Sequence, residues 1–204
     1  MKKTALSAML AVAFGVAALA PQPATASDGK LIFKGEITTA TCTVTGGGAA
    51  SGAGNITVTL PSVSESALHA AGSVAGEAPF QLILGGGTEC TSGKTASLWI
   101  ESAQTLALDS TTGALKNLDG TAAVVQVQMV NPANNQPIHL GINETFANGA
   151  TVVSGSNQPA ATINSGHTAT LSYVAQYLHP LTSTAGAVTA GTVDTFLTYS
   201  MQYN

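Results

Sequence analysis

The chain ends in the stretch that decides the fold: Val193-Asp194-Thr195-Phe196-Leu197-Thr198-Tyr199-Ser200-Met201-Gln202-Tyr203-Asn204. Its odd-numbered positions carry Val, Thr, Leu, Tyr, Met and Tyr, whereas the even-numbered positions are mostly polar, with Phe196 as the exception. Because side chains alternate between the two faces of a β-strand, this pattern predicts a strand with one buried face. A hydrophobic strand at a chain end must join a sheet or remain an exposed edge that can pair with another chain. Taken alone, the pattern is more typical of the ordinary last strand of a complete β-sandwich.

Short strands with β-branched residues are expected along the rest of the chain as well. They are predicted, in addition to 193–203, at residues 31–37, 41–44, 55–60, 79–84, 96–101, 123–130, 137–140 and 168–178. The turn cluster 131–135 makes a hairpin of the strands on either side. The glycine-rich stretches 46–54 and 149–159 are expected as loops, and 64–71 is the single helix-like stretch. Many short strands without intervening helices predict an all-β sandwich.

The first residues indicate export from the cell. Lys2 and Lys3 precede an apolar run over residues 5–20, and Ala24-Thr25-Ala26 supplies the small residues of a signal-peptidase site. Residues 1–26 are therefore predicted to be a signal peptide, and the mature chain is expected to start at Ser27. No other stretch approaches the ~18 apolar residues of a membrane span. We therefore expect an exported protein without membrane insertion.

The charge of the mature chain excludes nucleic acids as partners. It has four lysines, no arginine and ten acidic residues, so its formal net charge is −6. Nucleic-acid binding needs a basic surface that neutralises phosphates, and this composition does not offer one.

The two cysteines, Cys42 and Cys90, both lie in the mature part. An even pair in an exported chain predicts one disulfide, because the compartment is oxidising. A metal site would need histidines or further cysteines at ligand spacing nearby, and the sequence has none there.

No catalytic, cofactor-binding or metal-binding constellation is predicted. No serine lies in a GxSxG turn, and Gly85-Gly86-Gly87 lacks the lysine and the following helix that phosphate binding needs. Asp109 and Asp119 lie in loop-like surroundings, where solvated carboxylates are expected. Trp99 on an apolar strand is more often a core residue than a sugar platform. Four histidines are scattered without metal-ligand spacing: His69, His139, His167 and His179.

Several segments together suggest a family. GKLIFKGEI at 29–37 and TCTV at 41–44 are followed by PFQLIL at 79–84, VQVQM at 125–129, PIHLG at 137–141 and YVAQY at 173–177. Tyr203 is the penultimate residue, and Gly191 is fourteenth from the end. In this order and spacing, the chain resembles the type 1 fimbrial subunits of the chaperone–usher pathway over essentially its whole mature length.

The resemblance implies an incomplete immunoglobulin-like β-sandwich, the pilin fold, which lacks its last strand and is completed by a donor strand. Residues 27–40 would be the donor extension ahead of a pilin domain at 41–204. The implied donor residues alternate along the extension: Gly29, Leu31, Phe33, Gly35 and Ile37. The implied acceptor groove, which would also engage the chaperone, is lined by residues of the last strand: Gly191, Val193, Leu197, Tyr199, Met201 and Tyr203.

The resemblance also implies partners and a location. These are a periplasmic chaperone, an outer-membrane usher and other pilin subunits, in a fimbria on the bacterial surface that supports cell adhesion. The extension before Cys42 holds only fifteen mature residues, which also suits a minor tip-adaptor subunit. Shaft and adaptor roles therefore both stay open. A self-contained secreted carbohydrate-binding sandwich is the alternative from another class, although its loops would usually carry aromatics, which are absent from these loops.

Overall fold

The computed structural model describes residues 42–204 except 86, 144, 148–149, 153–155 and 182–185. The predicted signal peptide at 1–26 and the predicted donor extension at 27–40 lie outside the described residues.

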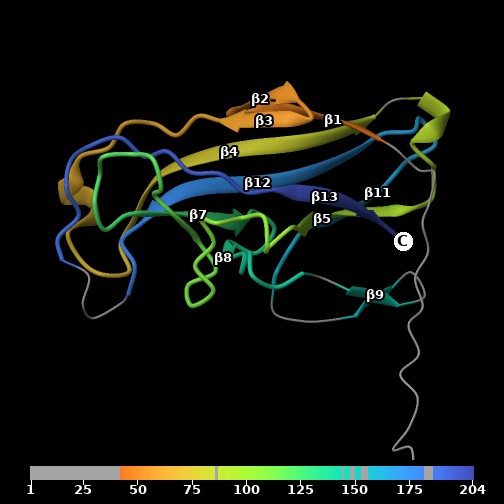
Figure 1. Cartoon of the computed structure of the whole chain (residues 1–204). Coiled ribbons are helices and arrows are strands. Elements are labelled where there is room, and N and C mark those ends of the chain that lie inside the picture. Colours follow the sequence, from red (N-terminus) through yellow and green to blue (C-terminus); the bar gives the residue numbers. More distant parts are fainter. Residues whose placement is uncertain (1–41, 86, 144, 148–149, 153–155, 182–185) are drawn as a thin grey trace, which may run out of the picture. The chain divides into compact units, whose positions relative to one another are not determined.

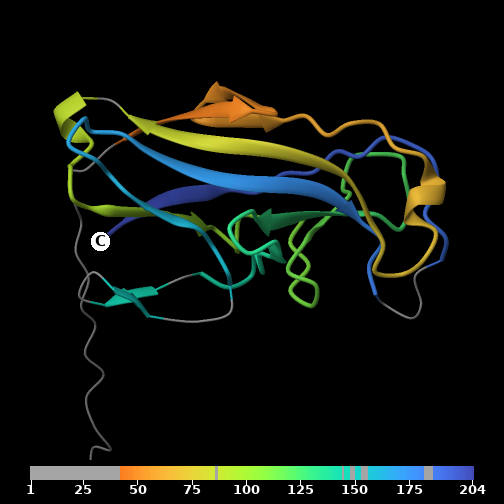
Figure 2. The same cartoon turned by 180° about the vertical axis from the view of Figure 1, so that it is seen from behind.

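A large antiparallel sheet forms one layer of the domain (Figures 1 and 2). Its strands follow the order β3-β2-β1-β4-β12-β7-β6, and β8 also pairs with β7. Nine register pairs join β4 and β12, the two longest strands, which lie side by side in both views. The strands of this sheet are β1 (Thr43–Gly48), β2 (Ala50–Ala53), β3 (Asn55–Val58), β4 (Val74–Gly85), β6 (Leu115–Lys116), β7 (Gln126–Asn131), β8 (Gln136–Pro137) and β12 (Ala169–Leu178).

A smaller sheet in the order β11-β5-β13 forms the second layer. It consists of β5 (Thr95–Ile100), β11 (Ala160–Thr162) and β13 (Tyr199–Tyr203). A separate hairpin joins β9 (Thr145–Ala147) to β10 (Ala150–Val152), and two short 3-10 helices are η1 (Glu65–Leu68) and η2 (Gly87–Glu89). The prediction of an all-β sandwich is confirmed.

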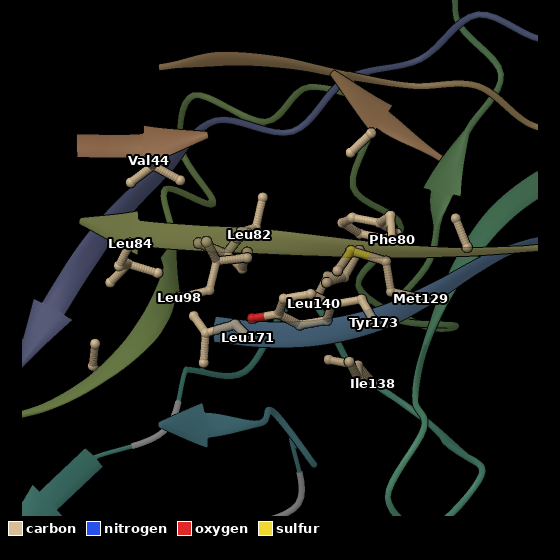
Figure 3. Packing of buried hydrophobic residues seen from close by; sticks show 14 of the residues in the cluster. Val44, Phe80, Leu82, Leu84, Leu98, Met129, Ile138, Leu140, Leu171 and Tyr173 are labelled. Carbon is tan, nitrogen blue, oxygen red and sulfur yellow. The ribbon is translucent and has the colours of Figure 1, made fainter. Parts of the chain in front are cut away.

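The core lies between the two sheets and follows from the alternation along the strands. In β4, Phe80, Leu82 and Leu84 are buried while the residues between them are exposed. Figure 3 shows these side chains in one cluster with Leu171 and Tyr173 of β12. Burying each large apolar side chain contributes roughly 1.5–3 kcal/mol, so this alternation is a main source of stability.

The predicted disulfide is confirmed: Cys42 and Cys90 are bonded, with their Cα atoms 4.4 Å apart. The bond ties the residue before β1 to the segment that follows β4. Closing a loop of this size stabilises a fold by roughly 4 kcal/mol in the chain-entropy model.

The prediction of a loop at 46–54 is wrong. This glycine-rich stretch completes β1 and forms β2, so that β1, β2 and β3 make a tight antiparallel meander. Gly48 has a φ of 68°, a conformation that strongly favours glycine, and a Cβ on Gly46 would lie 2.7 Å from the backbone nitrogen of Ser51. Glycine here permits close strand packing instead of marking a loop.

The C-terminal strand is shorter than predicted. Regular pairing with β5 begins only at Tyr199. Before it, Asp194 bonds to a loop described below, and Thr198 bonds to Thr105 and Glu101. Within 149–159, predicted as a loop, residues 150–152 form β10. Of the strand predicted at 137–140 only Pro137 pairs, whereas the predicted hairpin is confirmed by the pairing of Val130 with Pro137. The helix-like stretch 64–71 is one short 3-10 helix, with Ser64 as its N-cap.

Tyr173 carries a polar group into the core. Its ring stacks on Phe80 with centroids 5.3 Å apart, and its hydroxyl is buried without a hydrogen-bond partner in the described part of the chain. Burial raises the pKa of this hydroxyl, so it stays neutral. A buried hydroxyl without a partner costs free energy relative to an apolar atom.

We therefore expect Tyr173→Phe to raise the free energy of unfolding by about 1 kcal/mol, because it removes the hydroxyl and keeps the ring stack. Urea unfolding of the two proteins measures the difference. Tyr177→Phe is the control, since that hydroxyl is only part-buried. A loss of stability in Tyr173→Phe would mean that the hydroxyl has a partner.

Candidate functional site

An open groove lies where the two sheets meet. In the part of the chain that the structure describes, the edge strand of the large sheet, β3, pairs only with β2, and the edge strand of the small sheet, β13, pairs only with β5. Between these edges is a hollow of about 410 Å³. The sandwich therefore has two free edges that face the same opening, with space between them.

Apolar side chains form the walls and the floor of this groove. One wall comes from Ile56, Val58 and Leu60, and the other includes Val193, Leu197 and Tyr199. The floor consists of core residues that remain accessible from the opening: Phe80, Leu82, Leu98, Leu115, Val127, Met129 and Ala175. A second hollow continues the groove past Tyr199 to Met201, with Cys42, Val44 and Gly54 on its other side.

Within the described residues, the backbone of residues 192–204 is arranged as a strand that is paired on one side. Thr192 and Asp194 direct both their N–H and C=O groups to the loop 117–122. Asn204 exchanges both backbone hydrogen bonds with Thr95. Thr192, Asp194 and Asn204, all even-numbered, thus bond on the side away from the groove, and in an extended chain the odd-numbered backbone groups point the opposite way.

The odd-numbered backbone groups are accordingly free at the open part of the groove. Within the described ranges, the backbone N–H and C=O groups of Val193 and Thr195 have no hydrogen-bond partner. Such groups facing an apolar trough form a site for an added β-strand, which would satisfy them and cover the floor.

Two tyrosines of β13 reach toward the first strands. The hydroxyl of Tyr199 donates a 2.6 Å hydrogen bond to the carbonyl oxygen of Gly54, and the N–H of Cys42 donates to the hydroxyl oxygen of Tyr203. Burial raises the pKa of both tyrosines, and at Tyr203 it outweighs the opposing effect of the Cys42 N–H. Both hydroxyls therefore stay neutral well above neutral pH.

The structure separates the predicted acceptor residues into two groups. Val193, Leu197, Tyr199 and Met201 line the hollows, and Tyr203 lies beyond them at the Cys42 end. Gly191 is not among the lining residues. It packs against the loop 117–122, where a Cβ would lie 2.5 Å from the backbone nitrogen of Ala122. The five predicted donor residues, 29 to 37, lie outside the described part of the chain.

Sequence reasoning missed the opposite wall and the supporting loop. The alternation of Ile56, Val58 and Leu60 is visible in the sequence and could have indicated a wall of the groove. The loop 117–122 has no periodic pattern, so its contacts with residues 71 to 77 positions away could not be read from the sequence.

The residues considered for catalysis do not converge. Among the described residues no group of His, Cys, Asp and Glu could hold a metal ion. His179 is buried and its Nδ1 contacts the carbonyl oxygen of Leu68, whereas His69 is exposed. Asp119 is exposed, and Trp99 is half-buried on the outer side of β5. None of the helices in the described residues is long and apolar enough to cross a membrane.

Asp109 is a structural carboxylate rather than a reactive one. Burial alone would raise its pKa, but hydrogen bonds from the Thr111 N–H and the Gln126 side chain outweigh it and hold the pKa below its usual value.

Comparisons of the sequence and of the structure with known proteins agree with each other. Residues 60–204 match the family described as type-1 fimbrial protein, A. The chain is 33% identical over 188 residues to the major fimbrial subunit SMF-1 of Stenotrophomonas maltophilia (strain K279a), covering 92% of this chain and 99% of that protein. It is 34% identical over 194 residues to the F17 fimbrial protein of Escherichia coli, covering 93% and 95%. A subunit structure from a chaperone–usher pilus covers 91% of this chain and 100% of its own, with 18% identity and a TM-score of 0.50, so the fold is shared.

The close approach of Gly191 to Ala122 predicts a steric effect. We expect Gly191→Ala to lower the free energy of unfolding by about 1–3 kcal/mol, because its Cβ would overlap the backbone of the neighbouring loop. Gly186→Ala is the matched control, since a Cβ there has no neighbour within 4 Å. Thermal unfolding distinguishes the two variants, and equal melting temperatures would contradict the packing described.

Proposed function

The chain belongs to the type-1 fimbrial protein family, and from this membership we propose that it polymerises by strand donation into the groove between β3 and β13. It is a non-enzymatic structural subunit of a surface fimbria, and subunits of this kind polymerise with other pilins. Strand donation describes how one copy joins the next. Residues 29–37 of one subunit would enter the groove of its neighbour and complete the sandwich.

The observation that carries the proposal is the coincidence of an apolar floor with free backbone groups. The N–H and C=O groups of Val193 and Thr195, which have no hydrogen-bond partner within the described ranges, lie beside the groove. The floor of the groove consists of side chains that belong to the core of the sandwich. An incoming strand would bond to these groups with its backbone and fill the trough with alternate side chains. The alternation of Leu31, Phe33 and Ile37 in the extension supplies such side chains.

Two finer parts of the proposal rest on the relatives. We propose a shaft role, because the chain matches 99% of the length of a major fimbrial subunit. We also propose a periplasmic chaperone and an outer-membrane usher as assembly partners, since the shared fold is that of a chaperone–usher pilus subunit. Before polymerisation the chaperone would cover the same apolar groove.

A complementation experiment tests strand donation. The mature chain without residues 27–40 is melted with and without a synthetic peptide of residues 27–40. We expect the peptide to raise the melting temperature by about 10–20 °C, because it buries three large apolar side chains, worth about 5 kcal/mol together, in a domain of this size.

Two controls make the outcome specific. A peptide with Phe33→Asp should give little stabilisation, because a charge would enter an apolar trough. The protein variant Leu197→Asp should lose the response to the natural peptide for the same reason. An unchanged melting temperature with the natural peptide would refute strand donation into this groove.

A further inference from the structure

One wall of the groove is held in place by a loop instead of a strand. Residues 192–195 precede the paired part of β13 and have no strand beside them in the described structure. The loop 117–122, between β6 and β7, lies against them on the side away from the groove. The position of the wall therefore depends on this contact.

Asn117 is the centre of the contact. Its Nδ2 donates hydrogen bonds to the carbonyl oxygens of Ala122 at 2.8 Å and Thr192 at 3.1 Å. Its Oδ1 accepts hydrogen bonds from the N–H groups of Gly120 at 3.1 Å and Asp194 at 2.8 Å. A single carboxamide thus shapes its own loop and binds two alternate residues of the wall.

Further bonds complete the pairing. The backbone N–H of Thr192 donates to the Thr121 hydroxyl oxygen, and the N–H of Thr121 donates to the Thr192 hydroxyl oxygen. The carbonyl oxygen of Asp194 accepts from the N–H groups of Leu118 and Asp119. The loop satisfies the even-numbered wall residues as the neighbouring strand of a ladder would.

The backbone beside the loop is strained. Val124 has a φ of 56°, which is unfavourable for a β-branched residue. Such a conformation persists only where the surrounding contacts outweigh its cost. The adjoining Ala123 exchanges hydrogen bonds with Thr189, donating to its hydroxyl oxygen and accepting from its N–H. This contact ties the end of the loop to the segment that precedes the wall.

We propose that Asn117 is a positioning residue for strand donation, an inference that rests on the function proposed above. By fixing Thr192 and Asp194, it presents the backbone groups of Val193 and Thr195 to the incoming strand before that strand arrives. Binding then costs less conformational entropy, because this edge is already ordered. The occupant of the edge is an extended segment of a second copy of the chain.

The test follows folding and assembly separately in the full mature chain, residues 27–204. Trp99 is the only tryptophan and pairs with Ser200 of β13, so its fluorescence reports folding after dilution from denaturant. Light scattering in the same samples reports assembly. The variants are Asn117→Ala and Asn117→Asp, the second of which keeps the acceptor oxygens and loses the Nδ2 donors.

Asn164→Ala is the matched control. The Asn164 carboxamide also bridges its own loop, accepting from Gly166 and Thr168 and donating to Thr168, but it does not line the groove. We expect Asn117→Ala to fold at a rate like that of Asn164→Ala and to assemble about tenfold more slowly. Asn117→Asp should lie between Asn117→Ala and the natural chain. Hydrogen exchange of the Thr192 and Asp194 N–H groups should speed up in both Asn117 variants only.

The outcomes separate the two proposals. If the natural chain folds but does not assemble, strand donation itself is refuted, and this inference with it. If the natural chain assembles and Asn117→Ala assembles as fast as Asn164→Ala, the positioning role is wrong while strand donation stands. Should Asn117→Ala not fold, Thr192→Val decides in the same way, since it removes only the hydroxyl that Thr121 contacts.

Discussion

The fold depends on one physical constraint: the backbone hydrogen-bonding groups at the edge of a sheet need a neighbouring strand. Among the described residues, neither β3 nor β13 has a neighbouring strand on the side that faces the other, and the core between them is open to that gap. Two free strand edges without a defined arrangement could pair with other chains in many geometries and would promote aggregation. Here they face each other across an apolar floor, so one strand of the right length can satisfy both.

The rest of the domain holds these edges at a set separation. On one side the glycine-rich meander β1-β2-β3 extends the large sheet, and its tight packing depends on positions without a side chain. On the other side the loop 117–122 replaces a strand. The meander also adds Val44 and Ala50 to the core, and together the meander and the loop define the opening between the two edges.

The sequence allowed the fold class, the disulfide and one face of the last strand to be predicted, because each leaves a local signal. Alternation at Val193, Leu197 and Tyr199 indicates the face that lines the groove, where all three are half-buried, and a pair of cysteines in an exported chain indicates a disulfide. The other features do not leave such signals. Glycine at 46–54 indicated a loop because the same residue type serves turns and close strand contacts. Gly191 was expected in the groove, and the structure places it against a loop some 70 positions away, a contact that leaves no local signal.

The disulfide has a mechanical consequence. In a polymer joined through the residues that precede Cys42, a pulling force enters each domain at that cysteine. The covalent bond joins Cys42 to Cys90, beyond the end of β4, so the segment between them, which includes the meander, cannot be pulled out as a fully extended chain. In such a polymer, the bond would limit how far one subunit can lengthen while the filament is under load.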